Sequence, residues 1–109
     1  MTVEDLGNSS DFSALVMPDP KKELSGVYIG DLLSWVMGRA SGGDAWVTIM
    51  SNMNVLAVAT LADVSCVILA EGVSLDKEVA DAAKEKGINI LLSDKPEYET
   101  AIELSRLLK

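Results

Sequence analysis

The apolar residues of this chain fall into short runs, which are separated by polar stretches rich in Gly, Pro, Asp and Asn. Runs of this length without polar interruptions predict strands that are covered on both faces, as in a parallel sheet. The predicted strands are residues 26–29, 45–50, 65–70 and 88–92. The run 12–17 predicts a further strand, which would end at the following prolines because proline cannot continue a hydrogen-bonded ladder.

Helical spacing of apolar residues predicts helices between the strands. Residues 75–83 have the pattern of an amphipathic surface helix, which Ser74 or Asp76 can cap and which Gly87 can end in a left-handed conformation. A last helix of the same kind is predicted to start near Asp94 and to continue to the end of the chain.

Two other predicted helices, at residues 32–37 and 55–61, carry apolar side chains around most of their circumference. Each would expose apolar surface unless it were covered twice, either inside one domain or by a second molecule. Because so short a chain has few elements with which to cover them, we expect a homodimer. The predicted interface residues are Leu32, Trp35, Val36, Val55 and Val58.

The alternation of strands and helices predicts an α/β fold with right-handed connections. We expect three layers, with a mainly parallel sheet of four to five strands between flanking helices. A chain of 109 residues without a linker is expected to form one domain over residues 1–109.

The composition narrows the class of function. Seventeen acidic residues against nine basic ones give a net charge of −8, so neither nucleic acid nor an anionic membrane is an expected partner. Acids stand where a secretory signal would have Lys or Arg, and no apolar run reaches the roughly 18 residues of a membrane span. We therefore expect a cytoplasmic protein.

The chain contains no histidine, which excludes a Ser/His/Asp triad, a Cys/His dyad and an ordinary zinc site. Its one cysteine, Cys66, lies in an apolar run and is expected to be structural. The Gly42-Gly43-Asp44 turn lacks the Lys and Ser/Thr of a phosphate-binding P-loop. We expect no catalytic residues, no metal and no cofactor.

Ligands of open parallel sheets bind beyond the carboxyl ends of the strands. Asp31 can cap a helix there, although its charge would repel an anion, and Ser51 or Asn52 can cap the next. One capping side chain is enough for a helix start, so the additional Asn54 allows this corner to bind a phosphate, a carboxylate or a partner's backbone. An adenine nucleotide or another anionic molecule is therefore a possible ligand. The candidate ligand-binding residues are Gly30, Asp31, Ser51, Asn52 and Asn54.

Several segments resemble the DRTGG domain family over about residues 26–107, most specifically the Tyr28-Ile-Gly-Asp-Leu-Leu-Ser34 block. The others are 46–49, 54–59, 67–69 and 83–91. Members of that family occur alone or beside CBS domains in some pyrophosphatases, and the family is similar to the amino-terminal domain of HPr kinase/phosphorylase. The chain departs from the family where a Gln-Thr-His-x-Asn run is usual, because it has Met50-Ser-Asn-Met-Asn54.

The resemblance implies a noncatalytic, dimeric module for regulation or ligand sensing, with a partner enzyme or kinase. The kinase activity of the related protein lies in a separate P-loop domain, so the resemblance does not imply that activity here. One alternative is a scaffold that binds a partner without a small ligand. Another is a small phosphotransfer enzyme or phosphoacceptor that acts through Ser51, Asp31 and the neighbouring asparagines.

Overall fold

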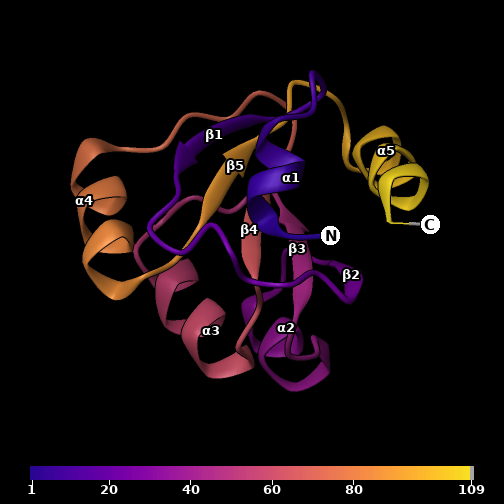
Figure 1. Ribbon diagram of the computed structural model, residues 1–109. Helices are drawn as coiled ribbons and strands as arrows, with labels where there is room; N and C mark the ends of the chain where they lie inside the picture. Colours follow the sequence, from indigo (N-terminus) through magenta and orange to yellow (C-terminus); the bar gives the residue numbers. More distant parts are fainter. Residues whose placement is uncertain (109) are drawn as a thin grey trace.

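The computed structural model describes residues 1–108, which form one sheet with helices on both of its faces (Figure 1). The strands are β1 (Ser13–Val16), β2 (Gly26–Ile29), β3 (Asp44–Thr48), β4 (Cys66–Leu69) and β5 (Ile90–Leu92). The helices are α1 (Val3–Gly7), α2 (Leu33–Arg39), α3 (Asn54–Ala62), α4 (Lys77–Lys86) and α5 (Glu97–Leu107). None of the helices within residues 1–108 has the length and apolar character needed to cross a membrane.

The five strands lie in the order β1-β5-β4-β3-β2. The β2–β3, β3–β4 and β4–β5 pairs are parallel, whereas β1 is antiparallel to β5. The predicted mainly parallel sheet is therefore confirmed, and the run 12–17 supplies its fifth strand. That strand lies at a sheet edge, where the prolines that follow it interrupt no ladder.

Side chains of the central strands alternate between two hydrophobic clusters. Trp46 and Val67 pack on the face covered by α2, α3 and α4, whereas Val47 and Ile68 pack on the face covered by α1 and α5. Every residue of β3 and β4 is buried, because both faces of these strands are covered. The three predicted layers are thus present, and Figure 1 shows α5 and α4 at opposite sides of the sheet.

The short helix α1 was not predicted, although its start has a sequence signal. The Thr2 hydroxyl accepts a hydrogen bond from the backbone N–H of Asp5 at 3.3 Å, and the Asp5 carboxylate accepts one from the N–H of Thr2 at 2.9 Å. These reciprocal bonds form a capping box, which lowers the pKa of Asp5. The cap lets a helix of only five residues bury Val3 and Leu6 against the sheet.

Two glycines hold backbone conformations that other residues rarely adopt. Gly87 ends α4 with φ of 73°, as predicted. Gly43 has φ of 88° in the turn before β3, where an added Cβ would overlap the Ser25 hydroxyl. Asp76 occupies the position before α4, but its side chain makes no capping hydrogen bond there.

Cys66 is fully buried in the cluster under α1 and α5. Its burial raises the pKa of the thiol to about 12, so the thiol stays protonated and unreactive at neutral pH. The predicted structural position of this cysteine is therefore confirmed.

The prediction that Val36, Val55 and Val58 form a dimer interface is wrong, because all three side chains are buried within one chain. Their exposed fractions are 0%, 2% and 4%, and they belong to the cluster between the sheet and the helices α2, α3 and α4. The sheet face and α2 cover one side of α3, whereas Leu61 on its other side is 69% exposed. Of the five predicted interface residues, only Leu32 and Trp35 remain exposed, at 59% and 55%.

The two tryptophans provide a test of this packing. Trp46 is fully buried and its Nε1 donates to the backbone carbonyl of Gly30 at 2.9 Å. We expect Trp46→Phe to lower the free energy of unfolding by about 2–3 kcal/mol, because it leaves a void and a carbonyl without its donor. Trp35→Phe is the matched control and should cost about 0.5 kcal/mol or less. Urea unfolding followed by circular dichroism measures both, and equal costs would contradict this packing.

Candidate functional site

The ends of β2 and β3 bring the two predicted ligand loops to one edge of the sheet. These strands are parallel neighbours, with Ile29 beside Val47, so the loops that follow them leave the sheet side by side. The loops after β4 and β5 leave at the same edge, because those strands run in the same direction. The loops that follow β2, β3, β4 and β5 together form the carboxyl edge.

Asp31 ties the first of these loops to the end of β3. Its Oδ1 accepts hydrogen bonds from the Thr48 hydroxyl at 2.8 Å and from the backbone N–H of Ile49 at 2.9 Å. The prediction that Asp31 caps α2 is wrong, because Leu32 occupies the capping position and has no side-chain cap. The carboxylate instead binds the loop after β2 to the end of β3.

The corner Ser51–Asn54 turns the chain into α3. The side-chain oxygen of Asn52 accepts from the backbone N–H of Asn54, the first helical residue, at 3.0 Å. Asn52 therefore binds one of the free N–H groups at the helix start, as predicted, although Met53 occupies the formal cap position. Ser51 does not cap the helix. Asn54 is exposed at the start of α3.

Glu97, in the first turn of α5, is a candidate site residue that our sequence analysis missed. Its Oε2 is buried and has no hydrogen-bond partner among residues 1–108. Burial raises the pKa of Glu97 to about 7, with further contributions from Asp31, to which the protonated acid can donate a hydrogen bond, and from the charge of Glu71. Glu97 therefore takes up a proton near neutral pH.

Glu71 reaches this region from the loop after β4 in a left-handed conformation, with φ of 63°. That conformation costs a residue other than glycine about 1 kcal/mol. The Glu71 N–H donates to the carbonyl of Lys95 at 2.9 Å, which ties the β4 loop to the β5 loop. Carboxylates from three loops thus gather at the carboxyl edge, yet no group of three or more within residues 1–108 could hold a metal ion.

The sequence contained a signal for Glu97. It follows Pro96 shortly after β5, and every parallel strand ends at the same edge, so each loop after such a strand is a candidate. The predicted ligand-binding residues lie only in the loops after the first two parallel strands.

A cavity of about 300 Å³ lies at the opposite edge of the sheet. None of the five predicted ligand-binding residues lines it. Its lining residues are Asp19, Lys22, Ala59, Thr60, Asp63, Val64, Lys86, Gly87 and Ile88.

Comparison with known families identifies the domain family of this chain. A family model described as the DRTGG domain matches residues 20–107, in agreement with the resemblance found in the sequence. No curated protein matches the chain. This chain belongs to the DRTGG domain family.

A solved structure has the same fold. It contains the CBS and DRTGG domains of the regulatory region of Clostridium perfringens pyrophosphatase, in complex with the activator diadenosine tetraphosphate. The two chains are 18% identical and superpose with a TM-score of 0.65. The match covers 97% of this chain and 48% of the other, so this chain spans about half the length of its structural neighbour.

The raised pKa of Glu97 predicts that the free energy of unfolding depends on pH. The folded pKa of about 7 exceeds the ordinary 4.5, so the folded state binds more protons and stability falls as the pH rises between these values. We expect Glu97→Gln to be more stable than the unchanged protein above pH 7, and the difference to vanish below pH 4.5. Because Glu97 is only partly buried, the gain should be about 1–2 kcal/mol.

Glu99→Gln is the matched control, because Glu99 lies in the same first turn of α5 and is exposed. It removes the same charge from the helix amino terminus without relieving a buried carboxyl. Urea unfolding across this pH range compares the two variants. Identical pH profiles for both would contradict the assignment of the raised pKa to Glu97.

Proposed function

We propose that this DRTGG domain is a noncatalytic regulatory module that forms a homodimer through α2 and senses a ligand on behalf of a partner enzyme. The observation that carries the proposal is the exposed apolar surface of α2 in a chain of a regulatory family. Val36 is the buried residue of this helix, whereas Leu32 and Trp35 are each more than half exposed.

The relative supports the regulatory part of the proposal. The structure with the same fold comes from the regulatory region of a pyrophosphatase and was solved with an activator bound. This chain corresponds to about half of that region, so a partner enzyme would be supplied by other parts of an assembly. The buried, protonated thiol of Cys66 and the lack of histidine favour a module without catalysis.

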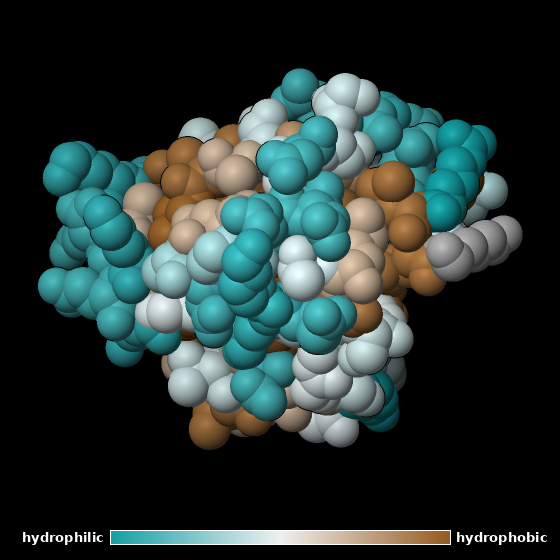
Figure 2. All heavy atoms as spheres, in the orientation of Figure 1, coloured by the Kyte–Doolittle hydropathy of each residue, from teal (hydrophilic) through white to brown (hydrophobic). Residues whose placement is uncertain are grey.

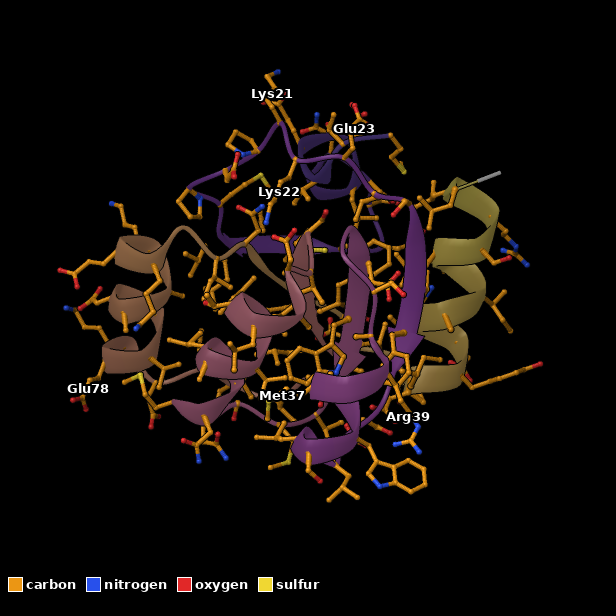
Figure 3. All side chains as sticks on the ribbon, turned by 90° about the horizontal axis from the view of Figure 1, so that it is seen from below. Lys21, Lys22, Glu23, Met37, Arg39 and Glu78 are labelled. Atoms are coloured by element: carbon orange, nitrogen blue, oxygen red, sulfur yellow. The ribbon has the colours of Figure 1, made fainter. Side chains whose placement is uncertain are left out.

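The composition of α2 supports an interface between copies. Residues 32–43 contain no acid, and Arg39 is their one charged residue, so α2 carries no negative charge in a chain of net charge −8. The Arg39 guanidinium lies 3.8 Å from the centre of the Trp35 ring, and Figure 3 shows Arg39 at the outer side of α2. Tryptophan and arginine are the residues that most often anchor protein interfaces. Two acidic molecules can approach each other here with little charge repulsion.

Neighbouring segments extend the apolar surface. Met53 at the start of α3 is 41% exposed, and Ile49 after β3 is 42% exposed. Figure 2 shows hydrophilic residues over α4 and hydrophobic residues at several places on this face, one of which is the lower end of the molecule in the region of α3. Exposed apolar side chains on several segments favour an interaction surface.

For ligand sensing we propose the loops that contain Gly30, Asp31, Ser51, Asn52 and Asn54. The start of α3 offers the exposed Asn54 side-chain amide to an anionic group, whereas the backbone N–H groups of Asn54, Val55 and Leu56 already donate hydrogen bonds. Asp31 and Glu97 oppose a negative ligand, and protonation of Glu97 would reduce this opposition. An adenine nucleotide is the ligand class that we would test first.

The dimer can be tested by placing a charge on α2. We expect the unchanged protein to sediment as a dimer, and Trp35→Glu to weaken the dimer about tenfold or more, because an apolar anchor of the interface becomes a charged side chain. The control is Leu15→Glu, because Leu15 is 45% exposed on β1, the edge strand farthest from β2 in the sheet. Analytical ultracentrifugation over a range of concentrations measures both. A monomer at every concentration would overturn the dimer.

Sensing can be tested by thermal unfolding with adenine nucleotides. A ligand present at 100 times its dissociation constant should stabilise the fold by about 2.7 kcal/mol. Asn54→Ala should reduce this effect, whereas the exposed Asn8, at the end of α1, should be replaceable by Ala without loss. If no nucleotide changes the unfolding temperature, nucleotide sensing is wrong and a scaffold that binds a partner is favoured.

A further inference from the structure

The cavity of about 300 Å³ lies at the end of the sheet opposite the carboxyl edge. Its floor includes Val64 and Ile88, which precede β4 and β5, and the rim includes the residues that end α3 and α4. Ala59, Val64 and Ile88 are buried members of the hydrophobic cluster under α3 and α4. These three residues also line the cavity, so a small part of its floor is apolar.

Lys22 reaches this cavity from the loop before β2. Figure 3 shows Lys22 directed inward from this loop and Lys21 directed away from the molecule. The Lys22 Nζ lies 3.3 Å from the Val64 carbonyl and 3.4 Å from the Asp63 carboxylate. Both contacts are long for charge-assisted hydrogen bonds, so the ammonium group keeps capacity for a stronger acceptor.

The loop that carries Asp19 and Lys22 is fixed by a buried asparagine. The Asn89 side chain is 1% exposed; it donates to the Asp19 carbonyl at 2.8 Å and accepts from the Asp19 N–H at 3.0 Å. It also donates to the Ser65 carbonyl at 3.0 Å. On the other side the Lys22 carbonyl accepts from the N–H of Val3. The rim is thus organised before any ligand arrives.

Asp63 forms the facing part of the rim. It ends α3 in a left-handed conformation with φ of 56°, a position that glycine usually occupies. Its side chain is 78% exposed and pairs only loosely with Lys22. The rim therefore carries two acids, Asp19 and Asp63, and two lysines, Lys22 and Lys86. A ligand of a single sign would meet two like charges, whereas a ligand with both signs can pair with each.

We propose that this cavity binds a small zwitterion with an aliphatic body, of the amino-acid class. Its carboxylate replaces Asp63 as the partner of Lys22, its ammonium group pairs with Asp63, and its hydrocarbon packs on Ala59 and Ile88. The site uses none of the residues proposed for nucleotide sensing, and it does not depend on dimer formation. Failure of either proposal would therefore leave the other unaffected.

Nuclear magnetic resonance of the ¹⁵N-labelled protein can test this site with L-leucine and 5-aminopentanoate as probes. We expect one or both to shift the amide signals of Thr60, Val64 and Ile88 in a saturable way at about millimolar concentration. The amide of Asn54, at the other end of α3, should shift much less. The two analogues that each lack one charge, 4-methylpentanoate and 3-methylbutylamine, should bind about tenfold more weakly than leucine.

Variants of the rim separate recognition from folding. Lys22→Gln and Asp63→Asn should each weaken the bound zwitterion about tenfold; asparagine tolerates the left-handed conformation of residue 63. Lys21→Gln is the control, because Lys21 points outward and pairs with Glu4. If neither zwitterion shifts the cavity amides, or if 4-methylpentanoate binds as tightly as leucine, the proposal is wrong. Equal weakening by Lys21→Gln would also overturn it.

Discussion

The burial of β3 and β4 on both faces is the constraint on which the rest of the structure depends. Neither strand has a residue on a solvated face, so helices must cover both sides of the sheet, and the connections between parallel strands must cross over it. Parallel strands in turn place every following loop at one edge. The polar chemistry of the carboxyl edge is therefore a consequence of how the central strands are buried.

At the carboxyl edge, Asp31 both stabilises the loops and disfavours a negative charge on Glu97. Asp31 accepts two hydrogen bonds from the end of β3, which fixes the loop after β2 against its neighbour. The same carboxylate lies near Glu97, whose buried Oε2 has no hydrogen-bond partner within residues 1–108. Burial raises the pKa of Glu97 most, and the nearby Asp31 carboxylate raises it further, so Glu97 keeps its proton to higher pH. The order of this edge is thus coupled to the pH.

The sequence predicted the strands well because their signal is local. Uninterrupted apolar runs marked β3 and β4 to within two residues, and Gly87 marked the end of α4. Burial of α3 could not be predicted in the same way, because which neighbours cover Val55 and Val58 depends on the tertiary packing of α2 and the sheet. The pairing of Asp31 with Thr48 and Glu97 also joins segments distant in the chain, and spacing alone does not reveal it.

Helix α3 links the three surfaces considered for function. It begins with Asn54 at the carboxyl edge, ends beside Asp63 at the rim of the cavity and packs against α2. Its nine residues span about 13 Å at 1.5 Å per residue, so the two ligand sites lie at the two ends of one short rod. Close-packed interiors leave little room for such a rod to move alone. A ligand that displaced either end of α3 would therefore also displace the apolar surface of α2.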